Sequence, residues 1–125
     1  MADAAAIEAI TRAIGAHVAW RNKLIQAIKT GFFEGEVESI RVDDNCAFGK
    51  WLQSRAISSD MKQGKPYEVV SRLHREFHQI AAQILVHVQQ KDQAKAADLM
   101  NSEFNRKSET LIRALNKWKG ELEAA

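Results

Sequence analysis

The sequence predicts an all-α protein, an up-and-down bundle of about three long helices plus one short helix that carries the cysteine. Apolar residues recur every three or four positions along three long segments, which is the spacing of a helix face that packs on other helices. No stretch of any length alternates apolar and polar residues as a half-buried strand does. The 125 residues include one proline and six glycines, too few for a loop-rich protein, and the length suits one domain over residues 1–125.

The first helix is expected from about Ala4 to Thr30, because Asp3 is a good N-cap and Gly31 is a good C-terminal stop. Residues that step by three and four form its expected buried seam. They are Ile7, Ile10, Ile14, His17, Arg21, Leu24 and Ile28. His17 lies inside this seam, where an unpaired polar ring would be costly to bury.

Residues 31–43 are predicted to be a connector with a short extended piece at Val37–Val42, since glycines and polar residues interrupt the apolar pattern there. Residues 43–45 (Asp-Asp-Asn) are all good helix caps. The short helix is therefore expected over about Asn45–Arg55, with Cys46 in its first turn. Residues 56–65 are predicted to be a loop.

Pro66 suits the first turn of a third helix, expected over about Pro66–Gln89. Two adjoining stripes predict that this helix is buried over a wide arc. One is Val70, Leu73, Phe77, Ile80 and Ile84, and the other is His74, His78, Ala81, Leu85 and Val88. Asp92 is expected to cap a fourth helix that runs to about Glu121. Its stripe is Met100, Phe104, Leu111, Leu115, Trp118 and Leu122.

Charge and hydropathy exclude several classes of partner. The net charge is only +2, and basic and acidic residues are interspersed without a basic stripe, so we expect no nucleic-acid partner. No apolar run is long enough to span a bilayer, so we expect no membrane partner either. The start, Met-Ala-Asp-Ala-Ala-Ala, lacks the features of a secretory signal, and we expect a cytoplasmic protein whose cysteine stays reduced.

Three short patterns contain the single cysteine and three of the four histidines. They are His-x-x-Trp at 17–20, Cys-x-Phe-Gly-x-Trp at 46–51 and His-x-x-x-His at 74–78. Two histidines four apart project from one face of a helix, and a cysteine in the first turn of a helix favours the thiolate. Three imidazoles and one thiolate are a complete tetrahedral ligand set for zinc.

Each of these residues also has a simpler interpretation as a core histidine, a chance His-x-x-x-His or a buried cysteine. The coincidence of four such side chains on three elements of one bundle favours the metal. His87 is different, because it lies about half a turn around the helix from His78 and roughly 20 Å along the axis from His74. We expect it to be a solvated or helix-end histidine.

The neighbours of these residues have predicted roles as well. Trp20 is placed to shield the site from water, and Gly49 to allow close approach of its turn to a neighbouring helix. Phe48, Trp51 and Leu52 are expected to anchor the short helix to the bundle.

In order and spacing, the three patterns resemble the bacterial chemoreceptor zinc-binding (CZB) domain. The resemblance covers nearly the whole chain, all three motifs are intact, and it implies that His17, Cys46, His74 and His78 are the zinc ligands. It also implies a helical bundle, often a homodimer, that senses zinc or oxidants, notably hypochlorous acid, through the zinc-bound cysteine. Such domains are usually fused to chemoreceptor signalling regions or diguanylate cyclases.

The chain shows no signature of either fusion partner, so it is expected to be either a stand-alone member or an excised domain. The natural-looking start and finish favour the stand-alone member, which would report to a chemoreceptor-type or cyclase-type protein. A closed four-ligand site leaves no position for a catalytic water, so we expect no enzymatic activity. A purely structural alternative stays open, in which zinc stabilises a helical adaptor or dimerisation protein without sensing. A hemerythrin-like diiron protein is disfavoured, because His87 is misplaced and Glu76 lies off the ligand face.

Overall fold

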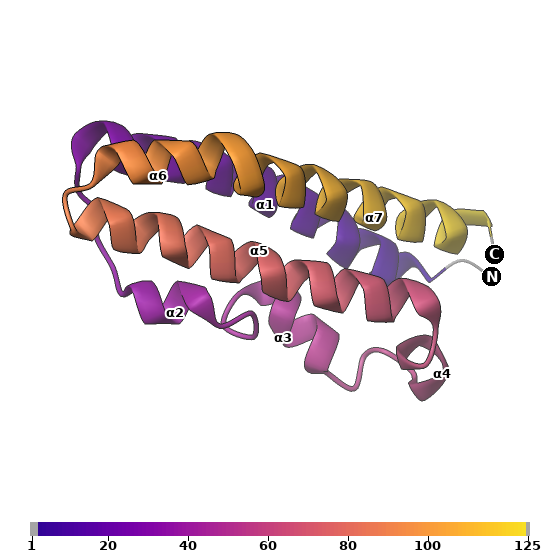
Figure 1. Ribbon diagram of the computed structural model, residues 1–125. Helices are drawn as coiled ribbons and strands as arrows, with labels where there is room; N and C mark the ends of the chain where they lie inside the picture. Colours follow the sequence, from indigo (N-terminus) through magenta and orange to yellow (C-terminus); the bar gives the residue numbers. More distant parts are fainter. Residues whose placement is uncertain (1–2, 125) are drawn as a thin grey trace.

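The computed structural model describes residues 3–124, and over these residues it contains helices and no strand (Figure 1). Residues 1, 2 and 125 of the expected domain, including the start of the segment considered as a secretory signal, lie outside the described residues. Within the described part, no helix is long and apolar enough to cross a membrane.

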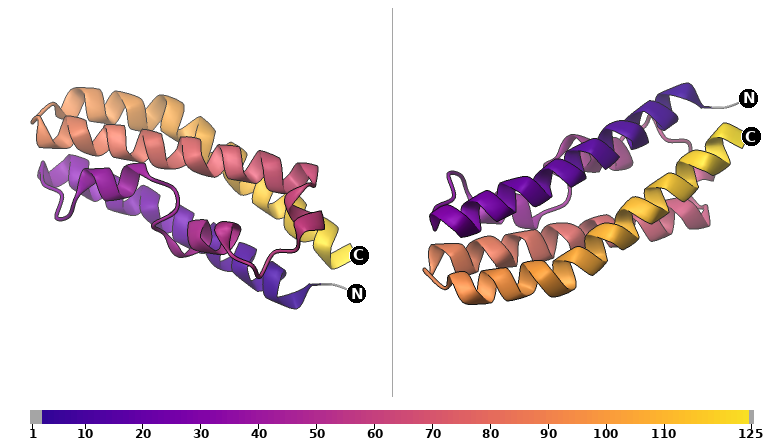
Figure 2. Two further views of the ribbon diagram at one scale, coloured as in Figure 1. Left: turned by 90° about the horizontal axis from the view of Figure 1, so that it is seen from below. Right: turned by 90° about the horizontal axis from the view of Figure 1, so that it is seen from above.

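Three long helical segments form the body of the molecule. They are α1 (Ala4–Thr30), α5 (Lys65–Gln89), and a third made of α6 (Gln93–Leu99), the π-helical turn η1 (Met100–Phe104) and α7 (Asn105–Ala124). α1 and α5 run in the same direction and the third segment runs back, so that both ends of the chain lie at one end of the bundle (Figures 1 and 2).

An interrupted helical segment, called the returning leg below, leads the chain from the end of α1 back to the start of α5. It consists of the short helices α2 (Val37–Arg41), α3 (Ala47–Gln53) and α4 (Ser59–Lys62), which follow one another along the bundle in the direction opposite to α1 and α5 (Figure 2). With this leg counted, the topology is up-and-down, and the all-α bundle predicted from the sequence is confirmed.

The long helices end where the capping residues predict. The Asp3 side chain accepts a hydrogen bond from the Ala6 N–H at 3.0 Å, and Gly31 ends α1 with φ of 72°. Asp92 caps α6 in the same way through the Lys95 N–H at 3.1 Å. α5 begins one residue before Pro66, and α7 continues to Ala124 instead of ending near Glu121.

Two predictions for the returning leg are wrong. The expected extended piece at Val37–Val42 is mostly α2, because Val37 and Ile40 lie on one helical face against α5 and an ion pair joins Glu38 to Arg41 at 3.1 Å. The expected loop at 56–65 contains α4, because the Ser58 hydroxyl caps it by accepting from the Met61 N–H at 3.2 Å.

The core lies between the long helices and follows the predicted stripes, of which Arg21 alone is exposed, while Ile7, Ile14 and Ile28 of α1 are half-buried. On α1, Ile10, His17 and Leu24 are buried, but Arg21 is exposed, and its guanidinium donates a hydrogen bond to the Asn105 side chain. Both stripes of α5 are buried except for Ile80, which is half-buried, as is Leu122 on α7.

The short helix α3 is anchored by the residues expected to do so. Phe48 and Leu52 are 5% and 2% exposed. Trp51 stacks on Phe48 with ring centroids 5.6 Å apart and lies 5.8 Å from the Trp118 ring of α7. The Tyr67 hydroxyl of α5 donates to the Leu52 carbonyl at 2.7 Å, so that α3 is tied to two long helices.

Gly49 permits a close approach, although not to a neighbouring helix as predicted. A Cβ atom at this position would lie 1.7 Å from the Asp43 carbonyl oxygen and 2.9 Å from the Asp44 Cα. The main chain of the preceding loop therefore lies directly against the first turn of α3, and only glycine leaves room for it.

We predict that Gly49→Ala destabilises the protein by about 2 kcal/mol or more, because the added methyl group forces the Asp43–Cys46 loop away from α3. Gly15→Ala is the matched control, since a Cβ there would meet nothing within 4 Å. The control should stabilise the protein by roughly 0.5–1 kcal/mol through helix propensity. Urea unfolding of both variants measures the difference, and equal effects would refute this role of Gly49.

Candidate metal centre

Four side chains from three parts of the bundle meet in the core. His17 comes from α1, Cys46 from the start of α3, and His74 and His78 from α5. One ligand atom from each side chain lies within 4.8 Å of all the others. The histidines are 2%, 0% and 3% exposed, whereas Cys46 is half-buried. The structure therefore brings together all four residues predicted from the sequence.

The distances among the donor atoms of Cys46, His74 and His78 are close to those around a tetrahedral zinc ion, and the His17 donor lies within 4.8 Å of these three. Zinc bonds of about 2.1 Å to nitrogen and 2.3 Å to sulfur imply separations of about 3.4 Å between nitrogens and about 3.6 Å between nitrogen and sulfur. The His74 and His78 Nε2 atoms are 3.1 Å apart. The Cys46 Sγ lies 3.3 Å from the first and 3.5 Å from the second.

Backbone carbonyls fix the protonation of two of the imidazole rings. The His17 Nδ1 lies 2.7 Å from the Ala13 carbonyl oxygen, and the His78 Nδ1 lies 2.9 Å from that of Ile40. A carbonyl oxygen only accepts, so each Nδ1 carries the proton and each Nε2 keeps its lone pair. Lone pairs that converge inside a core are favourable only with a proton donor or a cation between them, so the residues present fit a metal ion.

Cys46 is itself the N-cap of α3, rather than a residue of the first turn as predicted. Its Sγ accepts a hydrogen bond from the Gly49 N–H at 3.3 Å. Burial raises the pKa of the Cys46 thiol above its usual range, and the backbone N–H groups of Gly49 and Phe48 oppose this effect. A cation at the cluster is what would convert this buried thiol to a thiolate.

The three histidines of the cluster are neutral near pH 7. Burial lowers the pKa of His17 to about 4 and that of His74 to about 2. The pKa of His78 is lowered by burial as well. A metal ion therefore meets neutral imidazoles and displaces no histidine proton when it binds near neutral pH.

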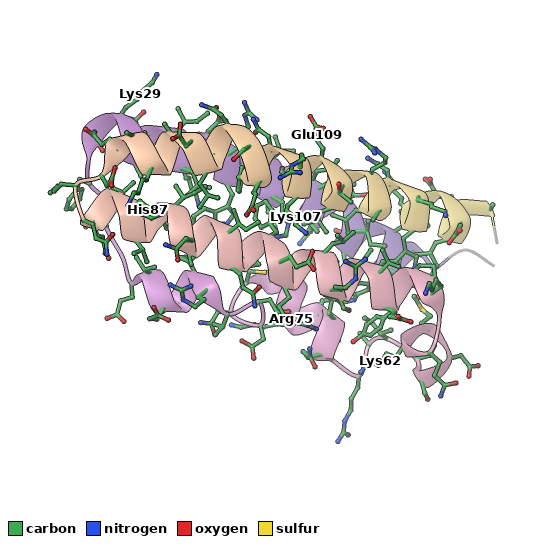
Figure 3. The ribbon with its side chains drawn as sticks, in the orientation of Figure 1. Lys29, Lys62, Arg75, His87, Lys107 and Glu109 are labelled. Carbon is green, nitrogen blue, oxygen red and sulfur yellow. The ribbon has the colours of Figure 1, made fainter. Side chains whose placement is uncertain are left out.

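The fourth histidine lies outside the cluster, as expected. His87 is in the last turn of α5, near the turn to α6 (Figure 3). It is half-buried rather than solvated, with its Nε2 at 3.4 Å from the Gln83 side-chain nitrogen. Glu76 is also off the ligand face, where it accepts a hydrogen bond from Lys107 at 2.7 Å.

A groove between α1 and α3 leads to the cluster. Its volume is about 560 Å³, and His17 and Cys46 are among the residues that line it. Trp20 and Trp51 line the groove as well, beside small alanine side chains of α1. Trp20 therefore borders the approach to the site without sealing it, which differs from the predicted shield.

Three groups that face the histidines of the cluster were not identified from the sequence. The Ala13 and Ile40 carbonyls are main-chain groups, to which side-chain identity gives no guide. Asp43 was considered only as a helix cap, yet its carboxylate lies 4.0 Å from the His74 Nδ1. A carboxylate three residues before the cysteine was the one available signal.

Comparison with known proteins identifies a family. The model of the chemoreceptor zinc-binding domain matches residues 17–85, which is more than half of the chain and contains all four cluster residues. No curated protein and no solved structure matches the chain. The resemblance seen in the three motifs is confirmed, and so is zinc as the cofactor of the domain.

We predict that the metal-free protein loses stability on acidification. Below about pH 6.5 His17 and His74 become protonated in the unfolded chain. In the folded protein they stay neutral until the pH approaches their lowered pKa values, about 4 for His17 and about 2 for His74. At pH 5 the loss is about 2 kcal/mol for each of these two rings. Urea unfolding with a chelator at pH 7 and pH 5 measures it. His17→Leu should reduce the difference by about 2 kcal/mol, and a free energy that does not change with pH would contradict the prediction.

Proposed function

Because the chain belongs to the chemoreceptor zinc-binding domain family, we propose that it is a sensory domain in which His17, Cys46, His74 and His78 hold one zinc ion. The observation that carries this proposal is the convergence of four donor atoms within 4.8 Å of one another in the core. Bound zinc supplies a positive charge that keeps the Cys46 thiol deprotonated and draws α1, α3 and α5 together.

The proposed role is sensing rather than catalysis. Four protein ligands complete a tetrahedron and leave no open position for a catalytic water or a substrate. The family is a sensory zinc-binding one and not a known enzyme family. We therefore propose that the site changes state in response to a signal and performs no turnover.

Hypochlorous acid is the oxidant that we propose as the signal, and Cys46 is the residue that receives it. Cys46 is the only half-buried member of the cluster, and it lines the groove between α1 and α3. Its thiolate sulfur attacks the chlorine atom, so that a sulfur–chlorine bond forms, the chlorine–oxygen bond breaks and hydroxide leaves. Water then displaces chloride and releases a proton, which leaves a sulfenic acid at Cys46.

A sulfenic acid is a poorer zinc ligand than a thiolate, so the centre loses its link to α3. The chain contains one cysteine, and no disulfide within the chain can follow. An external thiol would therefore restore the reduced state. α3 is only seven residues long, and the loop before it is the segment most readily released.

We further propose that the domain acts in the cytoplasm of a bacterium as a homodimer that reports to a chemoreceptor-type or cyclase-type signalling protein, in chemotaxis or cyclic-di-GMP signalling. Nucleic acids and membranes are not among the proposed partners. The whole chain is proposed to be one domain, because Leu115 and Trp118 of α7, beyond the matched residues, are buried in the same core as α3.

Two other roles share the same site. Zinc itself would be the signal if the ion exchanges under cellular conditions, and binding would then shift the bundle between loose and tight states. A structural role for zinc is favoured by the way the cluster joins α1, α3 and α5, since binding energy at such a site stabilises the fold.

We predict that Cys46→Ala, His17→Ala and His74→Ala each abolish tight zinc binding, because each removes one of four ligands from a closed site. His87→Gln is the matched control, since it changes the one histidine outside the cluster and should bind zinc as the natural chain does. Metal content after equilibration with a chelator is the measurement. A Cys46→Ala protein that retains one zinc per chain would refute the proposed ligand set.

We predict release of about one zinc per chain by a near-equal amount of hypochlorous acid, read with a chromophoric chelator on the reduced protein. Subsequent treatment with dithiothreitol should restore zinc binding, because a sulfenic acid is reversible by thiols. Release only at a large excess of oxidant would count against the oxidant signal and favour a zinc-sensing or structural role.

A further inference from the structure

One Nδ1 atom of the cluster is fully buried and has no hydrogen-bond partner. The His17 and His78 Nδ1 atoms each lie within 2.9 Å of a backbone carbonyl, but the His74 Nδ1 is buried without a partner in a ring that is 0% exposed. The other nitrogen of this ring, Nε2, faces Cys46 and His78, so only the nitrogen on the outer side of the ring lacks a polar partner. A buried N–H without a partner costs stability and leaves the ring free to tilt.

One carboxylate faces this nitrogen. The Asp43 Oδ2 lies 4.0 Å from the His74 Nδ1, about 1 Å beyond a hydrogen bond. The Asp43 side chain is 27% exposed and has no hydrogen bond to another described side chain. Asp43 therefore has both the chemistry and the freedom to close this gap.

The main chain of Asp43 packs against the turn that carries Cys46. Its carbonyl oxygen is 3.9 Å from the Cys46 Sγ and fits against Gly49, where a Cβ would approach to 1.7 Å. One residue thus contacts a histidine of α5 with its side chain and the cysteine turn of α3 with its main chain.

We propose that Asp43 is a positioning residue of the metal centre: its carboxylate accepts a hydrogen bond from the His74 Nδ1–H in the zinc-bound protein and holds the Cys46 turn against α5. The inference rests on the proposed function, because it concerns the residues assigned there as ligands. It explains why the outer nitrogen of His74 alone lacks a carbonyl partner. A carboxylate on a histidine ligand fixes the orientation of the ring and raises its basicity, so it strengthens metal binding.

The test compares Asp43→Ala and Asp43→Asn with the exposed neighbour, as Asp44→Ala, in zinc affinity measured by competition with a chromophoric chelator. We expect Asp43→Ala to weaken zinc binding by roughly 10- to 100-fold, and Asp44→Ala to remain within about twofold of the natural chain. Asp43→Asn keeps the shape and an accepting oxygen but loses the charge, so its loss should be intermediate. It also provides a folded variant if the alanine protein does not fold.

A second measurement separates positioning from general destabilisation. Histidine ¹⁵N–¹H NMR of the zinc-loaded natural chain should show an exchange-protected Nδ1–H signal for each of His17, His74 and His78. In Asp43→Ala only the His74 signal should be lost, and in Asp43→Asn only this signal should exchange faster, because the other two rings donate to backbone carbonyls.

The outcomes distinguish this inference from the function on which it rests. Natural zinc affinity in both Asp43 variants, or an equal loss in Asp44→Ala, would overturn the role of Asp43, and the ligand set would stand. Loss of all three signals together in Asp43→Asn would also overturn it. If the natural chain itself bound no zinc, the proposed function and this inference would fall together.

Discussion

The structure depends on one constraint, which is that three imidazole rings and a thiol are buried where α1, α3 and α5 meet. Polar atoms in a core need partners, and here the lone pairs of several rings point at one another. A zinc ion would give all four donor atoms a partner at once, and packing already holds them within 4.8 Å of one another. Phe48 and Phe77 hold the His17 ring at centroid distances of 6.2 Å and 5.0 Å, so the donors are placed by the core rather than by flexible segments.

The interruption of the returning leg between α2 and α3 follows from the same constraint. Within a continuous helix the backbone N–H groups are used by the helix itself, and its carbonyls are reached mainly by side chains of the same helix, as the Ala13 carbonyl is by His17. The end of α2 supplies the Ile40 carbonyl to His78, and the start of α3 supplies the Gly49 N–H to the Cys46 sulfur. A single long second helix would fill this side of the bundle equally well, but it would provide neither group. Two short helices with a loop between them provide both.

Much of this arrangement could be predicted from the sequence, because it depends on local chemistry. Asp3, Gly31 and Asp92 mark helix ends through their own side chains or backbone freedom, and those ends agree closely with the structure. The four residues of the cluster could be grouped because each belongs to a short motif on a predictable helix. The returning leg could not be predicted as well. Val37–Val42 fits a strand or a helix by its apolar spacing, and packing on α5 decides between them. The π-helical turn at Met100–Phe104 has no local signal, since it adjusts the register of residues buried against α5.

The position of Cys46 limits how far a change at the metal centre would spread. Leu52 is buried and Tyr67 donates to its carbonyl, so α3 would keep these anchors if the sulfur left the metal. The Phe48 ring, in contrast, packs on His17 and His74 and is coupled to the cluster. The loop at 43–46 is held by the hydrogen bond from the Asn45 side chain to the Ser39 carbonyl at 3.3 Å, by the fit against Gly49 and by the contacts of Asp43 and Cys46. Release of the sulfur therefore acts first on this loop and on the groove that Cys46 lines. The Trp51–Trp118 contact holds α3 against α7, whose last turns lie at the same end of the bundle as the first turns of α1 (Figure 1).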